Sequence, residues 1–420
     1  MQLEKPKLFP EKKIFIGVIL FFLFVILIRL FFEYQAYQQF ISKPFYYTHA
    51  KVLHAYQKSK GHQRYQVLKL RNQEGLTFYT TNYSKDHFAH KRLRLQIFPN
   101  KNISFADYLG TFYVKSRIKA QELLPATFKD RLLEKVASQH EKSSLQSFYN
   151  AIFFATLLEK ELREKIGMLG VSHLVALSGF HLGILWGLVY GLILLLYRPL
   201  QQHFFPYRHA LFDVGLTAMI LLGTYVWFVD FPPSLVRSYA MVLVGWIVLL
   251  LGLELLSFTF LTIIILILVA LFPSLLVSLG FGLSVAGVFY IFLLLQYSKG
   301  VKTWIISLIF IPLGIFLLML PIVHTVFPVT SGYQLLSPLL SLLFIPFYPF
   351  VIGLHLLGWG SLLDTGLSAL FALPKSSTES LLPLWAILGY IGISIGAIWS
   401  KKLFWSLKGL ALLYAMHLFL

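Results

Sequence analysis

Residues 170–197 read GVSHLVALSGFHLGILWGLVYGLILLLY, an apolar run that opens with two histidines, two serines and a glycine pair. As a helix, the run is long enough to cross a hydrocarbon layer of about 30 Å. Backbone groups in lipid must pair within their own segment, so a helix is the expected structure. Similar runs recur from Ile14 to the C-terminus. The sequence therefore predicts a polytopic α-helical membrane protein.

The composition supports this class and excludes others. Hydrophobic residues make up 57% of the chain and charged residues 13%, whereas a soluble domain carries about 25% charged residues. Cysteine is absent, which excludes a disulfide framework, a thiolate metal site and a cysteine nucleophile. The sequence contains no HExxH helix, GxSxG elbow or Walker A loop. We therefore expect no enzyme activity, no cofactor and no metal site.

The order of the apolar runs predicts about nine to eleven membrane segments. The first, Ile14–Phe32, follows four lysines and is interpreted as a retained anchor with a cytoplasmic N-terminus. Pro346 and Pro349 are expected to break the run 338–358 into a re-entrant hairpin, which keeps Lys401 on the cytoplasmic side. The later runs lie near 172–197, 210–229, 234–251, 255–272, 275–296, 303–324, 338–358, 383–399 and 403–420.

The segment between the anchor and the later runs is basic. Residues 33–170 contain 22 Lys and Arg against 11 Asp and Glu. This charge is compatible with a nucleic-acid partner, with anionic lipid headgroups or with neither. Residues 125–168 have the pattern of amphipathic helices. Five short strands, predicted at 48–56, 65–70, 76–81, 93–98 and 110–118, would form a small extramembrane β-rich, OB-like domain.

Polar groups inside the apolar runs are costly and mark candidate functional positions. The first cluster contains His173, Ser178, Gly179 and His181. A helix break at Ser178-Gly179 would bring the two imidazoles together. The alternative is a pair of interfacial histidines that are hydrogen-bonded to the backbone.

A second cluster joins two apolar runs and contains Asp230, Pro233, Ser234 and Arg237. Arg237 would lie about one helical turn inside the membrane. Its expected partner is Asp230, Asp213 or a passing phosphate. The alternative is a structural ion pair or an arginine that reaches the interface.

A third cluster contains Gly282 and Ser284, which suit close helix packing as well as they suit a pore lining. A fourth, from His324 to Gln334, has the composition of a solvated outer loop.

These clusters, in this order, resemble the ComEC family of competence proteins, the inner-membrane DNA channels of natural transformation. The most specific element is the first, from Gly170 to His181. The resemblance covers the segments 170–181, 233–237, 272–284 and 333–349. It implies a multi-pass protein of the bacterial inner membrane that passes one DNA strand inward while the other strand is degraded.

The resemblance also implies partners. These are single-stranded DNA, membrane lipids, a periplasmic DNA receptor, a separate nuclease and cytoplasmic single-strand-binding or motor proteins. No His-x-His-x-Asp-His motif occurs, so we expect the short form without a metallo-hydrolase-like domain. Interleaved basic and aromatic residues then favour DNA capture. The capture candidates are Lys91, Arg92, Arg94, Lys115 and Arg117.

Three other classes stay open from the sequence: a small-solute transporter, a lipid-modifying intramembrane enzyme and a non-transporting scaffold. The sequence shows neither the related halves of a transporter nor the tight acid–base group of an enzyme. The expected organisation is an N-terminal tail and anchor (1–32), an OB-like domain (33–124), surface helices (125–170), a channel domain (171–358) and C-terminal helices (359–420).

Overall fold

The computed structural model describes residues 8–9, 11–60, 63–84, 86, 88, 91–252 and 257–420. Its contacts divide the chain into two compact units. The strand unit contains Phe9–Thr127 and Ile263–Leu279, and the helical unit contains Phe128–Thr262 and Gly280–Leu420. Residues 33–127 of the basic segment thus belong to the strand unit, and residues 128–170 belong to the helical unit with most of the apolar runs.

Helix α1 (Lys12–Ser42) is one continuous helix of 31 residues. It extends past Phe32, where the anchor was predicted to end. Its C-terminal part buries Tyr37 and Phe40 in the core of the strand unit. The Tyr37 hydroxyl donates a hydrogen bond to the Ile103 carbonyl at 2.7 Å. The anchor helix is therefore packed directly into the strand unit.

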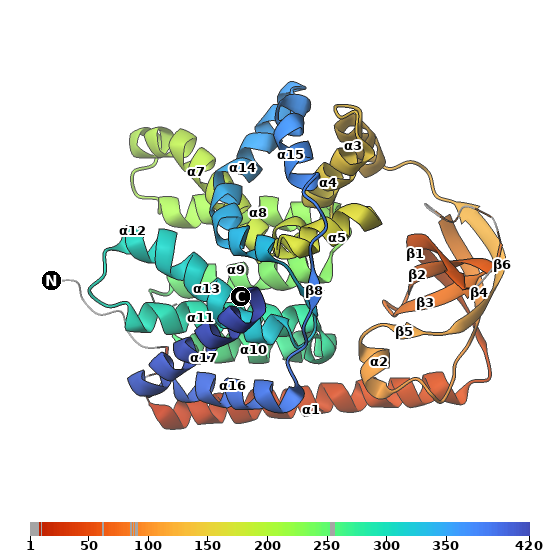
Figure 1. Ribbon diagram of the computed structural model, residues 1–420, viewed down its shortest axis with the longest axis horizontal. Helices are drawn as coiled ribbons and strands as arrows, with labels where there is room; N and C mark the ends of the chain where they lie inside the picture. The colour runs from red at the N-terminus through yellow and green to blue at the C-terminus, as the bar shows by residue number, and fades with distance from the viewer. Residues whose placement is uncertain are drawn as a thin grey trace. The chain divides into compact units, whose positions relative to one another are not determined.

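The strands of this unit form one sheet in the order β5-β3-β2-β1-β4-β6 (Figure 1). β5 is parallel to β3 and the other pairs are antiparallel. All five predicted strands form, and the last is divided in two. The bounds are β1 (Tyr46–Lys60), β2 (Gln63–Asn72), β3 (Thr77–Asn82), β4 (Lys91–Phe98), β5 (Phe112–Tyr113) and β6 (Lys115–Leu123).

The divided strand closes the sheet into a ring. Only Val114 separates β5 from β6, and its N–H donates to the Tyr79 carbonyl at 2.9 Å. The Thr80 and Ser116 hydroxyls lie 2.8 Å apart across the join. β5 and β6 therefore act as one bent strand that pairs first with β3 and then with β4. Short helix α2 (Phe105–Leu109) precedes it.

The apolar runs form helices close to their predicted positions. Six helices in the described residues are long and apolar enough to cross a membrane, and three more are apolar but shorter. This confirms a multi-pass helical protein, while the total of nine to eleven segments stays a prediction. The six are Lys12–Ser42, Gly179–Phe204, Ala210–Phe228, Leu279–Tyr297, Thr303–Val323 and Gly332–Leu357; the shorter ones are Ser234–Leu250, Phe258–Leu271 and Leu384–Gly396.

The remaining bounds follow the same order along the chain. The surface segment forms α3 (Phe128–Ala137), α4 (Ser143–Phe154) and α5 (Lys160–Met168). The later elements are α6 (Ser172–Val175), α7 (Gly179–Phe204), α8 (Ala210–Phe228), α9 (Pro233–Leu250), α10 (Phe258–Leu271), η1 (Pro273–Val277), α11 (Leu279–Tyr297), α12 (Thr303–Ile305), η2 (Ile306–Phe310), α13 (Ile311–Val323), β7 (Val329–Thr330), η3 (Gly332–Leu336), α14 (Ser337–Leu357), η4 (Gly360–Leu363), α15 (Asp364–Phe371), β8 (Thr378–Glu379), α16 (Leu384–Gly396) and α17 (Lys401–Phe419).

The predicted break at Pro346 is wrong, because α14 runs unbroken through Pro346 and Pro349. Each proline removes one backbone donor. Pro346 lies on the exposed side of α14, whereas Phe344 and Tyr348 on the other side are buried. Packing along that buried side holds the helix together, as neighbouring helices do for prolines in membranes.

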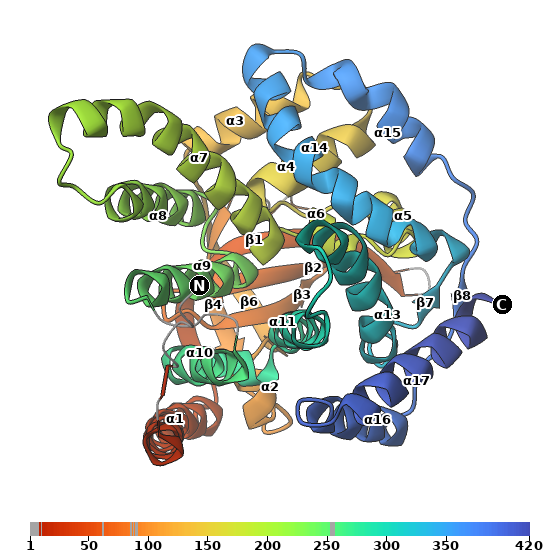
Figure 2. The same ribbon diagram turned by 90° about the vertical axis from the view of Figure 1, so that its left-hand side faces the viewer.

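After α14, the chain nevertheless comes back to the residues that precede this helix. β8 pairs with β7, which precedes α14, and the Ser380 N–H donates to the Pro328 carbonyl at 2.8 Å. Figure 2 shows α14 lying crosswise to α8 and α11, with α15 folded back beside it. The residues before and after this excursion therefore lie side by side.

Candidate nucleic-acid interface

Strand alternation places Arg92 and Arg94 on the outer surface of the strand unit, because Leu93 and Leu95 point inward and are fully buried. Lys91 has the inward-facing parity and lies at the end of β4. Its ammonium donates a hydrogen bond to the Gln121 side chain at 3.0 Å. The three neighbouring capture candidates therefore do not share one surface.

Aromatic and basic side chains from adjacent strands surround these arginines. His49 pairs with Arg94 across β1 and β4, and the Arg94 guanidinium lies 5.8 Å from the Tyr47 ring centre. On β6, the Arg117 guanidinium lies 5.5 Å from the Phe98 ring centre. We call this surface the Arg–aromatic face; it consists of Tyr47, His49, Lys51, Arg92, Arg94, Phe98 and Arg117.

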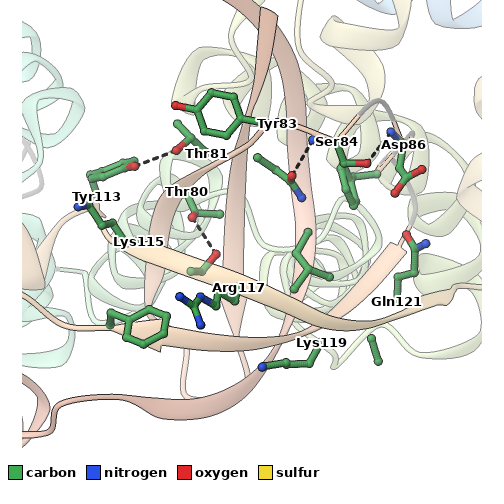
Figure 3. A pocket seen from close by; sticks show the side chains of 16 residues that line it. Thr80, Thr81, Tyr83, Ser84, Asp86, Tyr113, Lys115, Arg117, Lys119 and Gln121 are labelled. Atoms are coloured by element: carbon green, nitrogen blue, oxygen red, sulfur yellow. Dashed lines mark hydrogen bonds between the residues drawn. The ribbon is translucent and has the colours of Figure 1, made fainter.

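A groove of about 1040 Å³ runs along the join between β3 and β6. Figure 3 shows Tyr83 on the β3 side, and Arg117 and Lys119 along β6. Tyr83 is 68% exposed, and Tyr113 is 50% exposed. Lys115 also lines the groove, and Arg117 belongs to both the groove and the Arg–aromatic face. Exposed rings beside cations provide stacking surfaces for bases and contacts for phosphates.

In the helical unit, the helix break expected at Ser178-Gly179 is present, because α6 ends at Val175 and α7 begins at Gly179. The two imidazoles still make different contacts. His173 Nε2 lies 3.3 Å from the Ser341 hydroxyl, and His181 Nδ1 lies 3.3 Å from the Ser178 hydroxyl. His181 is fully buried, and none of the described residues forms a hydrogen bond with its Nε2.

The second cluster packs directly against the first. Pro233 is the first residue of α9, and the Ser234 hydroxyl donates to the Leu177 carbonyl at 2.7 Å. A Cβ added at Gly179 would lie 2.9 Å from the Ser238 hydroxyl. A glycine is therefore required here for the start of α7 to approach α9.

Arg237 lies on α9 and is 6% exposed, and its Nε has no hydrogen-bond partner in the described part of the chain. The carboxylates expected to pair with it have other partners. Asp230 lies 2.9 Å from the Lys129 ammonium, and Asp213 lies 2.8 Å from the Arg208 guanidinium. Among the described residues, no carboxylate forms an ion pair with Arg237.

The third cluster meets this site at one point. The Phe281 ring centre lies 5.9 Å from the Arg237 guanidinium. The adjacent Gly282 is exposed, and nothing lies within 4 Å of a Cβ added there. Ser284 is half-buried. Close helix packing therefore does not explain Gly282.

One face of α14 connects the first and last of the resembling segments. The Ser337 hydroxyl donates to the Gly170 carbonyl at 3.1 Å. The His181 ring centre lies 5.0 Å from that of Phe344 and 4.9 Å from that of Tyr348. These α14 residues follow one another at spacings of seven and four, which places them on one side of the helix.

Several residues of the interface were not singled out in the sequence. Tyr47, His49 and Lys51 alternate along β1, and this alternation is a signal that was available. Tyr113 and Lys119 belong to the groove only because the last strand bends between β5 and β6. That bend has no clear mark in the sequence.

The fold and these contacts define a multi-pass helical membrane protein with a basic, aromatic strand unit. The family model described as Competence protein matches residues 155–419, which is more than half of the chain. The chain therefore belongs to the Competence protein family and has a role in DNA uptake for competence. No curated protein and no solved structure matches the chain.

Proposed function

We propose that this protein captures single-stranded DNA on its strand unit and passes the strand across the bacterial inner membrane through its helical unit. The observation that carries the proposal is the Arg–aromatic face, present on the same chain as helices of the Competence family. A strand offers phosphates and unstacked bases, and arginines beside exposed rings bind both. The incoming strand would come from a periplasmic DNA receptor and a separate nuclease, and cytoplasmic proteins would draw it inward.

We further propose that residues 33–124 form an OB-like barrel. The ring formed by β1, β2, β3, the bent β5–β6 strand and β4 has the strand number of that fold. OB-folds bind oligonucleotides on one strand face and in adjoining loops. The Arg–aromatic face and the neighbouring groove would together be this surface.

In the helical unit, we place the DNA path beside His173, His181 and Arg237. Arg237 supports this because it is buried without a carboxylate partner among the residues that the structure describes, so a passing phosphate would supply a negative charge. Gly179 and Ser234 support the contact between the start of α7 and α9, Ser178 caps α7, and Asp230 and Pro233 lie just before and at the start of α9. Gly282 and Ser284 lie beyond Phe281.

The proposed orientation has the N-terminus in the cytoplasm and the strand unit outside. η1 supports the outer position of the residues after α10, because Val277 lies 3.4 Å from a Cβ added at Gly110, beside α2. The return through α15 supports a cytoplasmic position for Lys401 and Lys402, as the charge bias of loops requires. In this orientation, the crosswise α14 and the return through α15 would give the topology for which a hairpin was expected.

Deletion of the gene tests the function. Labelled DNA should still reach the periplasm of the deletion strain, while its entry into the cytoplasm is lost. Entry at the normal level would exclude a channel. Loss of a small solute or a lipid product with normal DNA entry would instead favour a transporter or an intramembrane enzyme.

A further inference from the structure

Three titratable side chains from separate parts of the helical unit meet in its interior. His140 lies in the turn between α3 and α4, His355 lies in the last turns of α14, and Asp364 is the first residue of α15. His140 and His355 are 4% and 6% exposed. The proposed DNA path uses none of these three groups.

The three side chains form an unbroken chain of hydrogen bonds. His140 Nδ1 lies 2.9 Å from an Asp364 carboxylate oxygen. His140 Nε2 lies 3.0 Å from His355 Nε2. His355 Nδ1 lies 2.7 Å from the Val351 carbonyl oxygen. Every ring nitrogen therefore faces another polar atom at hydrogen-bond distance.

The three hydrogen bonds fix the number of protons that the two histidines and Asp364 hold together. Each of the three gaps needs one proton, and the Val351 carbonyl supplies none. An ionised Asp364 and two neutral imidazoles hold only two protons between them. With two protons, at least one gap brings two lone pairs face to face. A third proton fills every gap and makes the trio electrically neutral, which suits a buried site.

No other group near the two rings takes the place of this proton. Tyr149 stacks on His140 with ring centres 4.4 Å apart, and burial, followed by the Asp364 charge, raises the pKa of its hydroxyl. It therefore stays neutral. Glu141 and Lys142, next in the chain, are exposed. Within the described ranges, no group of three or more acidic or histidine side chains is arranged to hold a metal ion.

We infer that His140, His355 and Asp364 form a proton-binding site that fastens the α3–α4 turn onto the end of α14 and the start of α15. The bound proton is shared along the chain of hydrogen bonds. Gln139 reinforces the same junction, because its amide donates to the His355 carbonyl at 3.2 Å and accepts from the Gly360 N–H at 2.8 Å. Attachment of the surface helices is therefore linked to pH.

The sign of the linkage follows from the proton count. In the open state both imidazoles meet water, where the ordinary pKa of an imidazole is about 6.5. Above that pH, the open trio holds close to two protons and the closed trio holds three, so closure takes up one proton and weakens as pH rises. Well below it, the open trio holds four protons, so closure must release one. The closed junction is favoured most strongly in the window between these limits.

The absence of native cysteine allows a direct measurement on the full chain in lipid nanodiscs. Val136→Cys places one thiol on the buried side of α3, and Ser138→Cys places one at the exposed residue directly after this helix. The ratio of maleimide labelling at 136 to labelling at 138 reports opening and corrects for thiol ionisation. Between pH 7 and 9 we expect the ratio to rise about fivefold or more, with a limit near tenfold per pH unit for one proton.

Two further variants distinguish proton binding at this site from a general loosening of the helical unit at high pH. His355→Gln removes one titrating ring and keeps an amide that can bond, so its ratio should stay flat over the same range. Asp364→Asn removes the counter-charge, so the rise should move to lower pH. A flat ratio in the native background, or an equal rise in His355→Gln, would overturn the inference. If His355→Gln does not fold, the pH shift in Asp364→Asn decides by itself.

Discussion

The strand unit and the helical unit use polar groups in opposite ways. On the Arg–aromatic face, several cations lie in water beside exposed rings, and Tyr47 is 52% exposed. Around α14 and α9, Arg237 and His181 are buried, and each has a nitrogen without a hydrogen-bond partner within the described ranges. Each exposed charge is one of several on the surface and is screened by salt. A buried charge has a high desolvation cost, and no neighbouring charge can replace it. Substitutions in the strand unit should therefore reduce DNA binding gradually, whereas a single substitution in the helical unit should reduce DNA uptake sharply.

The largest effect is expected at Arg237. Arg237→Leu should lower uptake of labelled DNA into the cytoplasm by about 100-fold or more, while its melting temperature stays equal or rises, because a buried cation without a carboxylate partner is removed. Transformation frequency and thermal unfolding of the same purified variant provide the two measurements.

Two controls accompany this variant. Arg237→Lys keeps the charge and should retain part of the uptake. Arg198→Leu removes an exposed arginine of α7 and should leave uptake within a factor of about two of normal, as surface substitutions usually do. Normal uptake in Arg237→Leu at a normal protein level would remove Arg237 from the DNA path.

An intermediate effect is expected on the Arg–aromatic face. Binding of a labelled single strand to the full chain should weaken when Arg92, Arg94 and Arg117 are changed together to Gln. The slope of log affinity against log salt should fall by about 2, since each phosphate contact contributes roughly 0.7 for single strands. Fluorescence anisotropy at several salt concentrations measures it.

Lys91→Gln is the matched control, because Lys91 is adjacent to Arg92 in sequence but has the inward parity and bonds Gln121. Its salt slope should equal that of the native chain. A salt slope that changes as much in Lys91→Gln as in the triple variant would show that the outer face does not define the binding surface. An unchanged slope in the triple variant would remove this face from DNA capture.

The sequence predicted the elements better than their connections. Apolar runs and alternating strands depend on local periodicity, so the helices and the five-strand pattern could be placed from residues alone. The continuity of α14 could not, because a proline penalty is local while the packing of Phe344 and Tyr348 that offsets it is not. The bent β5–β6 strand likewise depends on two partners, β3 and β4, that are distant in sequence.

In the candidate site, too, the features that depend on local sequence were predicted and those that depend on distant contacts were missed. Ser178 and Gly179 were recognised because a polar pair interrupts an apolar run. Asp230 and Asp213 were two of the three partners expected for Arg237, but they pair with Lys129 and Arg208 instead. Lys129 reaches Asp230 through the tertiary fold, and a helical offset from Arg237 does not reveal this. The His140–His355 contact joins residues 215 positions apart, and neither histidine is marked by a motif.

The smallest effect is expected for an exposed ion pair of the helical unit. Glu164 and Lys375 lie 3.0 Å apart, and the hydrogen bond from Lys375, followed by its charge, lowers the pKa of Glu164. A carboxyl with a lowered pKa stabilises the fold above its ordinary pKa, and this contribution disappears as pH falls through the lowered value. Since the pair is solvated, Glu164→Gln should leave the melting temperature at pH 7 unchanged within error. Any difference from the native chain should vanish in acid. A clear loss of stability at pH 7 would show that solvated charges in the helical unit also act individually, and the contrast between the two units would fail.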